Sequence, residues 1–568
     1  MHIDVVPNRN SRPAYLLRES YRIGKKVRKR TLANLSHLAI EQIEAIRLAL
    51  RGEKMVPAAD LFNATSSLHH GHVQAVLETM RRLDFANLLN MRPGRQRDVA
   101  MAAVAARVLQ PNSKLATTRW WRNTTLPELF DVANADEDEI YAAMDWLLEH
   151  QPTIEKKLAA RHLKEGSLIL FDLTSSYFEG KCCPLAELGH NRDKKKGKLQ
   201  VNHGLLADPR GCPVAVAVFA GNINDPKTLI PQVQKARSQF GLQKLVMVGD
   251  RGMISQKQIN TLKGMEGVAW ITALRSKAIE GLIADGTLQL GLFDERNLFE
   301  MIHPRYPGER LVACRNPELQ KLRAAKRQDL LRATVKELEL VRGMVERGTL
   351  RGEGKIGVRV GKVINKYKVA KHILLDIQKE RLEWRVDEEQ VAAEALLDGI
   401  YVIRTSLSKA QMDAADTVRS YKDLSRIERA FRSLKSIDLL VRPIRHWTPE
   451  RVRAHIFLCM LAYYVQWHMI EAWRPLLFAD EDQAAKATRD PVAPANRSRA
   501  ALEKVHSKVL DDGTEAHSFR TLLEQLSTIV RNTCQRKNAA DREPTFQMDT
   551  TPNPKQQRAL DLIGEIKL

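Results

Sequence analysis

The sequence SLILFDLT at residues 167–174 is a short apolar run that follows a turn signal. A run of this kind predicts a buried strand. Residues 201–207 and 213–220 predict a hairpin, because the turn between them has proline second and glycine fourth. Further apolar runs at residues 245–250 and 268–273 predict two more strands. With helices between the later strands, this order predicts a mixed α/β sheet.

The segments around this predicted sheet have other sequence patterns. The hairpin is followed by a predicted helix that Asp225 can cap and that runs to about Phe240. Apolar positions recur at helical spacing in much of residues 37–165, and residues 316–347 form a long charged helical stretch. Strand-like runs follow it. They lie at residues 371–377, 380–386 and 399–405.

These patterns divide the chain into five segments. We expect a basic arm and a helical region in residues 1–165, the first part of the sheet core in 166–275, an inserted strand-rich module with a charged helix in 276–415, the second part of the core in 416–475, and a basic, partly helical C-terminal region in 476–568.

The charge balance points to a polyanionic partner. The 568 residues include 90 Lys and Arg against 68 Asp and Glu, a net charge of +22. Nucleic acid is the commonest partner of so basic a protein, and the alternative is a basic protein without such a partner. With 44% apolar and 28% charged residues, the composition is that of an ordinary folded protein rather than a disordered or fibrous chain.

The compartment is expected to be the cytoplasm. Six cysteines without a regular framework favour a reducing environment. The N-terminus does not have the order of a secretory signal. The longest apolar run, Ile456–Val465, is far shorter than the roughly 20 residues that span a bilayer, so no membrane association is expected.

Two aspartates occupy unusual positions in the predicted sheet. Asp172 lies in the middle of an apolar strand, where a carboxylate costs several kcal/mol unless it is paired or bound to a metal. Asp250 ends another apolar run, at the strand end where α/β active sites collect. The structural alternatives are a salt bridge for Asp172 and a helix cap for Asp250.

A third acid lies on a predicted helix. Tyr421, Glu428 and Lys435 are seven residues apart, and this spacing places them on one line down a continuous helix. Arg432 lies one turn beyond Glu428 on the same line. A metal-binding acid beside phosphate-binding cations is one interpretation. The alternative is a surface Glu–Arg pair.

Taken together, the three acids form a chemical unit. Asp172 and Asp250 on strands and Glu428 on a helix can hold two Mg²⁺ ions, which prefer oxygen ligands; we expect Mn²⁺ to substitute. Two such ions catalyse in-line phosphoryl displacement. Basic segments could hold the DNA, or could be solvated surface; they are the arm before residue 36 and the loop with Lys194, Lys195, Lys196 and Lys198. For Trp120 and Trp121, at least one is expected in the core.

These residues resemble the DDE transposases of bacterial insertion sequences, in particular the branch with a Tyr-Arg-Glu-Lys signature and a strand-rich insertion. The resemblance covers roughly residues 166–470. It rests on LILFDLTSSYFEG around Asp172, KLVMVGDRGMIS around Asp250, YKDLSRIERAFRSLK around Glu428, and GHNRDKKKGKLQVNHGLLADPRGCPVAVAVFAGN between the two aspartates. The signature Arg position is Leu424 here, and Arg432 or Arg426 could substitute.

The resemblance implies a ribonuclease-H-like core and an endonuclease that also joins DNA. The enzyme would bind the element's inverted-repeat ends as a homodimer, cleave them, and join the 3′-hydroxyl ends to target DNA by cut-and-paste recombination. It would therefore be associated with the nucleoid. Asp172, Asp250 and Glu428 would be its catalytic metal ligands, and Tyr421, Arg432 and Lys435 would contact DNA. Trp270 or Trp384 would stack where a flipped base departs.

Three alternatives remain open from the sequence. One is a related nuclease that cuts without joining, and another is a DNA-binding protein that has lost catalysis. The third is a zinc site, although its candidate ligands fit no finger or ribbon spacing well. They are Cys182, Cys183, His190, His203 and Cys212.

Overall fold

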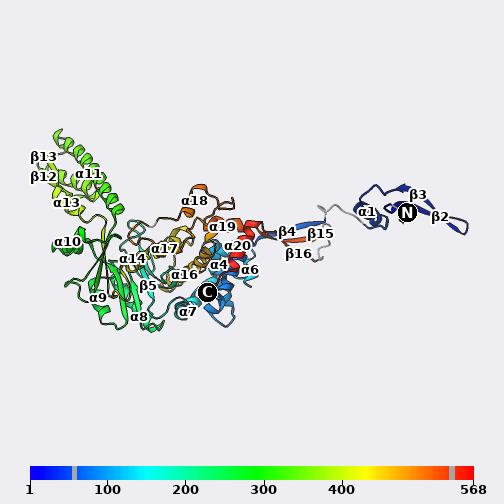
Figure 1. Cartoon of the computed structure of the whole chain (residues 1–568), viewed down its shortest axis with the longest axis horizontal. Coiled ribbons are helices and arrows are strands. Elements are labelled where there is room, and N and C mark those ends of the chain that lie inside the picture. The colour runs from blue at the N-terminus through cyan, green and yellow to red at the C-terminus, as the bar shows by residue number, and fades with distance from the viewer. Residues whose placement is uncertain (10, 54–60, 495, 537–543) are drawn as a thin grey trace. The chain divides into compact units, whose positions relative to one another are not determined.

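The structure is a computed structural model that describes residues 1–9, 11–53, 61–494, 496–536 and 544–568. The chain forms two compact units, whose elements are labelled in Figure 1. The smaller unit combines Met1–Leu68 with Val530–Thr550, and the larger combines His69–Ile529 with Thr551–Leu568. Each unit is therefore built from two separate stretches of the sequence.

A mixed sheet forms the centre of the larger unit. Its core strands lie in the order β9-β8-β5-β6-β7, in which β5, β6 and β7 are antiparallel neighbours and β8 and β9 run parallel to β5. This arrangement confirms the predicted ribonuclease-H-like fold. The strands are β5 (Leu168–Tyr177), β6 (Gln200–Ala207), β7 (Pro213–Ala220), β8 (Leu245–Val248) and β9 (Val268–Ala273).

Strands from the predicted insertion extend the same sheet. Beyond β9 lie β14 (Ile400–Thr405), β11 (Arg310–Arg315) and β10 (Leu298–Met301), each antiparallel to its neighbour, which completes eight strands within the described residues. The insertion is therefore only partly a separate module. Its own core lies between two helices and a hairpin, α11 (Pro317–Glu346), α12 (Glu353–Tyr367), β12 (Ile373–Gln378) and β13 (Arg381–Val386).

Long helices cover the sheet. α16 (Pro449–Ala472) packs against β7 and against α4 (Arg95–Leu109) and α7 (Glu137–His162). Residues on every side of α16 are buried, which explains why its sequence is apolar all round. No helix among the described residues is both long enough and apolar enough to cross a membrane.

The predicted helix around Glu428 is interrupted. α14 (Ala414–Lys422) ends before Asp423, α15 (Leu424–Arg432) begins after it, and a π-helical turn follows at Ser433–Ile437. Tyr421, Glu428 and Lys435 therefore belong to three successive elements, and the prediction of one continuous line was wrong. The Asp225 prediction also needs correction, because its side chain does not cap α8 (Pro226–Ser238).

The remaining helices of the larger unit are shorter. They are α2 (Gly71–Arg82), α3 (Phe85–Leu89), α5 (Lys114–Trp121), α6 (Leu126–Leu129), α9 (Gln256–Lys263), α10 (Ser276–Ala284), α13 (Glu388–Ala395), α17 (Ala484–Thr488), α18 (Arg499–Ser507), α19 (Phe519–Ser527) and α20 (Pro554–Gly564).

The smaller unit is built largely from strands. One antiparallel sheet has the order β1-β2-β3, and a second has the order β16-β15-β4. The basic arm is thus an ordered hairpin. The elements are β1 (His2–Val6), β2 (Ala14–Ile23), β3 (Lys26–Asn34), α1 (Ile40–Leu50), β4 (Phe62–His69), β15 (Val530–Arg536) and β16 (Phe546–Asp549).

Candidate active site

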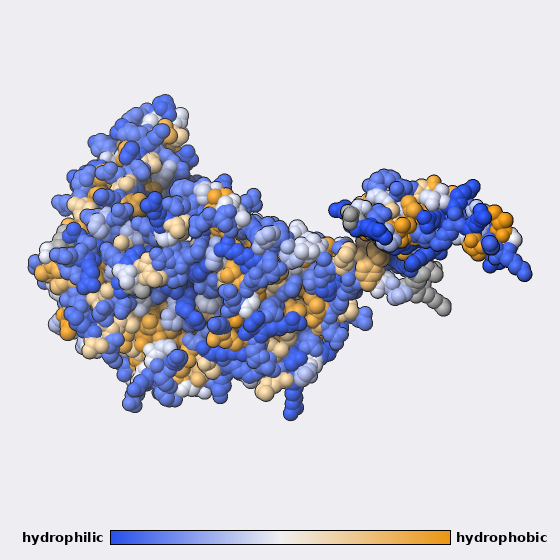
Figure 2. Space-filling view, turned by 45° about the vertical axis from the view of Figure 1, so that its right-hand side comes forward, coloured by the Kyte–Doolittle hydropathy of each residue, from blue (hydrophilic) through white to orange (hydrophobic). Residues whose placement is uncertain are grey.

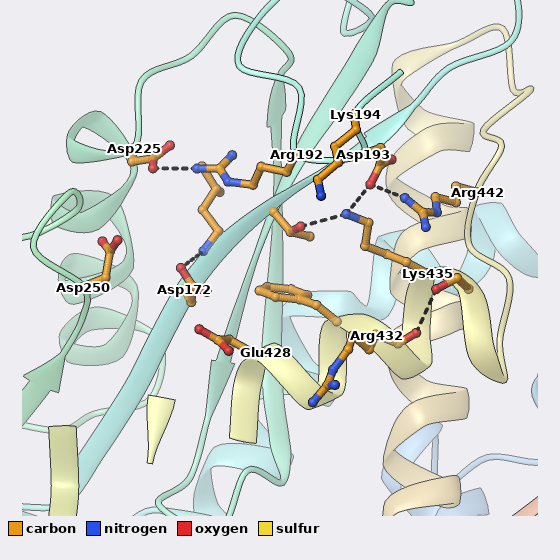
Figure 3. Close-up of a pocket in the computed structure, with 14 residues that line it drawn as sticks. Asp172, Arg192, Asp193, Lys194, Asp225, Asp250, Glu428, Arg432, Lys435 and Arg442 are labelled. Carbon is orange, nitrogen blue, oxygen red and sulfur yellow. Dashed lines mark hydrogen bonds and ion pairs between the residues drawn. The ribbon is translucent and has the colours of Figure 1, made fainter. Parts of the chain in front are cut away.

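A pocket of about 420 Å³ brings the three predicted acids together (Figure 3). Asp172, Asp250 and Glu428 all line it. The remaining charged residues of its lining are Arg192, Asp193, Lys194, Asp225, Arg432, Lys435 and Arg442. One cavity thus holds a group of carboxylates beside a group of cations.

The sheet register explains how the two aspartates meet. On the parallel strands β5 and β8, Leu170 pairs with Val248. Asp172 and Asp250 each lie two residues further along the chain, Asp250 just beyond the end of β8, so both are brought to the same edge of the sheet. α15 packs against β5, and in Figure 3 the carboxylate of Glu428 points from that helix toward the strand of Asp172.

The three acids differ from the other carboxylates of the pocket in how they are held. Within the described residues, no ion pair involves Asp172, Asp250 or Glu428. Asp172 accepts a hydrogen bond from the Leu173 N–H at 2.8 Å. One oxygen of Asp250 accepts the N–H groups of Gly252 and Met253 at 3.1 and 2.8 Å, which orders the loop after β8. The salt bridge considered for Asp172 is absent here, while Asp250 does stabilise the turn after its strand.

Burial and crowding favour the protonated form of Asp172. Its pKa is raised to about 7, chiefly by burial and also by the nearby carboxylates of Asp250 and Glu428, against the lowering effect of the Leu173 hydrogen bond and the Arg192 charge. Carboxylates that repel one another, and that form no ion pair with any described residue, fit a divalent metal ion. The donor set is therefore that of a hard-metal site.

Lys435 is held inside the protein. It is 8% exposed, and its ammonium contacts the Asp193 carboxylate at 2.5 Å and donates to the Thr174 hydroxyl at 3.0 Å. Arg442 pairs with the same Asp193 oxygen. Burial lowers the pKa of Lys435, whereas Asp193 raises it. In this structure Lys435 supports the wall of the pocket through Asp193.

The other signature positions differ in exposure. Arg432 is exposed at the pocket. Tyr421 lies outside the pocket lining, yet it is near enough to the acids that burial and the charge of Asp250 raise its pKa to about 12. Leu424 is buried in the core, and Arg426 pairs with Asp423 at 2.8 Å. Of the two substitutes considered for the signature arginine, Arg432 is the one that reaches the pocket.

The lysine loop is anchored at its base. The backbone N–H of Arg192 donates to the Ser175 hydroxyl at 3.0 Å, and its guanidinium pairs with Asp225 at 2.5 Å. Asp193 accepts the Tyr177 N–H at 2.9 Å. Of the four lysines of this loop, Lys194 lines the pocket; Lys195, Lys196 and Lys198 do not.

Four charged residues of this site were missed in the sequence, namely Arg192, Asp193, Asp225 and Arg442. Arg192 and Asp193 lie inside the quoted segment between the two aspartates, next to Lys194, so the segment pointed to them without distinguishing them. Nothing local in the sequence marks Arg442, because its role depends on Asp193, which is far away in the chain.

Both candidate tryptophans contact other side chains in this structure. Trp270 is 3% exposed, and its indole N–H donates to Glu309 at 3.2 Å. Trp384 is half-buried beneath the Arg342 guanidinium, 4.9 Å from the ring centre. Trp121 is fully buried, as expected for at least one member of its pair, whereas Trp120 is half-buried beside a second hollow.

The proposed zinc ligands do not converge. Among the described residues, Cys212 is grouped instead with His162 and His468, with its sulfur 4.0 and 3.9 Å from their Nε2 atoms. Arg210 lies 3.2 Å from Nδ1 of His162 and can only donate there. Nε2 of His162 therefore carries the proton and faces the Tyr464 hydroxyl at 3.0 Å, an arrangement that does not suit a metal ligand.

Comparison with known proteins gives two family matches. The transposase DDE domain matches residues 164–465, more than half of the 568 residues, and the N-terminal domain of the IS1634 family transposases matches residues 3–58. No curated protein matches the chain. A cryo-EM structure of piggyBac transposase in a synaptic complex with hairpin DNA aligns with 80% of this chain and 77% of that chain, at 7% identity and a TM-score of 0.34. The DDE-domain match includes all three acids of the pocket.

Proposed function

This chain belongs to the family of transposases with a DDE domain, and we propose that it cleaves the ends of its own mobile element and joins them to target DNA. Membership implies DNA binding and dependence on a divalent metal. The observation that carries the finer proposal is the convergence of Asp172, Asp250 and Glu428 in one pocket, where none of them forms an ion pair with a described residue.

In this proposal the three carboxylates hold Mg²⁺, or Mn²⁺ in its place. When bound, two such ions activate the attacking oxygen and stabilise the leaving oxygen in an in-line displacement at phosphorus. The half-buried setting of Asp172 excludes much of the solvent and strengthens its interactions. Asp172 must lose its proton before it can act as a ligand, because a metal ion competes with that proton.

The cations of the same pocket have a separate task. Arg192, Lys194 and Arg432 face the space beside the acids, where they can hold the phosphate oxygens that flank the scissile bond. Asp225 and Asp193 fix the base of the lysine loop, so Arg192 and Lys194 are presented from a rigid element. We further propose that two copies of the chain pair two element ends.

The test compares acid variants on DNA that carries the sequences flanking the coding region. We expect Asp172→Asn, Asp250→Asn and Glu428→Gln each to abolish strand cleavage in Mg²⁺ while DNA binding persists. Glu179→Gln is the matched control, because Glu179 forms an exposed ion pair with Arg445 outside the pocket and its variant should cleave normally. Normal cleavage by any one of the three acid variants would refute the assignment.

A joining assay separates transposition from simple cleavage. A precut end with a free 3′-hydroxyl should be joined to a plasmid by the wild-type protein and by Glu179→Gln. Cleavage without any joining would identify a nuclease instead. Failure of the wild-type protein to cut in either Mg²⁺ or Mn²⁺ would favour a protein that only binds DNA.

A further inference from the structure

The hairpin of β2 and β3 extends beyond its sheet. β1 pairs with β2 only as far as Arg18, which is opposite His2. Beyond that point, Glu19–Ile23 pairs with Lys26–Arg30 alone. We call Glu19–Arg30 the ribbon. Its strands are exposed from Ser20 onward, on both faces, so none of the described residues of its own unit covers it.

The ribbon carries a large excess of positive charge. Glu19 is its one acid, and it pairs with Arg30 at 3.0 Å, while Lys29 pairs with Asp4 at 2.8 Å. No carboxylate of the described residues forms an ion pair with the other four cations, Arg22, Lys25, Lys26 and Arg28. A strip of unpaired cations on both faces matches a polyanion rather than another basic surface.

Apolar side chains are interleaved with these cations. Tyr21, Ile23 and Val27 are 41%, 58% and 59% exposed. Tyr21 lies opposite Arg28, and Val27 lies opposite Arg22 on the other face, so each face combines an apolar group with a cation. The space-filling view also shows apolar surface among hydrophilic side chains on this unit (Figure 2). Such groups can contact base edges and thymine methyls while the cations reach phosphates.

The end of the ribbon is narrow and has a fixed register. Ile23 pairs with Lys26, which leaves Gly24 and Lys25 as a two-residue turn. Gly24 has a φ of 61°, a conformation that glycine adopts without strain, at the first central position where hairpin turns favour it. The two strands therefore stay paired to the tip and present a slim, stiff shape.

The dimensions of the ribbon decide between the two grooves of DNA. The six residue-to-residue steps from Arg18 to Gly24 span about 20 Å, and the two strands lie about 4.8 Å apart. A two-stranded ribbon fits the major groove of B-DNA, which is about 12 Å wide and 8.5 Å deep, but not a minor groove about 6 Å wide. We propose that the ribbon enters the major groove of duplex DNA. The inference rests on the proposed function in one respect, namely that the duplex is DNA on which the proposed transposase acts.

The test uses the full chain and two variants that lose the same two cations. The first deletes Tyr21, Arg22, Val27 and Arg28, which removes two cross-strand pairs, keeps the turn and preserves the alternation of faces. The second is Arg22→Gln with Arg28→Gln, which keeps the full length. Affinity for a random-sequence DNA duplex is measured by fluorescence anisotropy over a range of salt concentrations.

We expect the shortened ribbon to bind at least about tenfold more weakly than the charge-matched double variant, because it also loses its reach into the groove. The double variant should reduce the slope of log affinity against log salt by about 2, one unit for each phosphate contact. Arg22→Lys with Arg28→Lys keeps the charge and should retain that slope. If the shortened chain does not fold, the two full-length double variants, with Gln or with Lys at positions 22 and 28, still test the ribbon through the salt slope.

Other outcomes overturn the inference. Equal affinities of the two charge-matched variants would indicate a surface charge patch without groove entry. Competition by netropsin, which fills the minor groove, but not by methyl green, which occupies the major groove, would contradict the assigned groove. Stronger competition by duplex RNA than by duplex DNA would contradict the partner. If the wild type and both ribbon variants bind and cleave alike, only this inference fails; if the wild type neither binds nor cleaves, the proposed function fails.

Discussion

The burial of the Asp172 carboxylate lowers the stability of the metal-free protein. Its pKa is raised to about 7 from 3.8, so folding opposes its ionisation. The penalty is absent at pH values below 3.8, develops as the pH rises, and is complete above about pH 7. We therefore expect Asp172→Asn to raise the free energy of unfolding by about 1–3 kcal/mol above neutrality and by much less in acid, with this value reduced for the partial exposure of the site.

Thermal unfolding in EDTA across this pH range measures the effect. Added Mg²⁺ should stabilise the wild-type protein at neutral pH, because a ligand of the folded state alone favours folding. The variant should gain much less. A difference between the two proteins that does not change with pH would show that the carboxylate of Asp172 is not under strain in the apo state.

For single residues, the sequence could predict those whose type is unusual for their local sequence. Asp172 was found because a carboxylate interrupts an apolar strand. The burial of Lys435 could not be predicted, because it depends on Asp193, more than two hundred residues earlier. The burial of Trp270 could not be predicted for the same reason. Its indole N–H donates to the buried Glu309, which the sequence around Trp270 does not reveal.

Among the elements, the lysine loop depends on Asp193. This carboxylate is 1% exposed, pairs with both Lys435 and Arg442, and accepts the Tyr177 N–H. Asp193→Asn keeps the hydrogen bond but leaves two cations without their counter-charge. We expect a loss of about 2–4 kcal/mol in unfolding free energy, which urea denaturation would measure.

Asp225→Asn is the matched control, because Asp225, which directly precedes α8, anchors the same loop through its ion pair with Arg192. The pair of Asp225 with Arg192 is partly exposed, so its loss should cost less than about 1 kcal/mol. Equal losses of unfolding free energy in the two variants would show that Asp193 stabilises the loop no more than Asp225 does. A normal stability of Asp193→Asn would place Lys435 and Arg442 in solvent, free to contact DNA directly.

The element scale also shows what a pattern can and cannot predict. The five core strands follow from apolar runs, because strands buried on both faces need them. The break at Asp423 was missed, since a seven-residue spacing gives one line only if the helix is continuous. The addition of β10, β11 and β14 to the core sheet was also missed, because a strand's sequence does not specify which edge it joins.

For the whole molecule, the net charge of +22 governs association with DNA. Cations that form no ion pair with any described residue occur both on the ribbon and at the pocket, where Arg432 is exposed. Each phosphate that is neutralised releases counterions, so log affinity should fall linearly with log salt at a slope of about −0.9 per contact. With roughly six or more contacts, affinity should fall about a thousandfold between about 50 and 200 mM salt.

Anisotropy titrations of the full chain at several KCl concentrations measure this slope. Asp172→Asn should give the same slope as the wild type, since the acid contacts no phosphate in the absence of metal. The titrations are therefore done in EDTA, which removes divalent ions from the counterion balance and isolates the contribution of the protein's own cations. A slope near zero would mean that the excess cations do not contact phosphates, and that contacts to bases or sugars dominate binding instead.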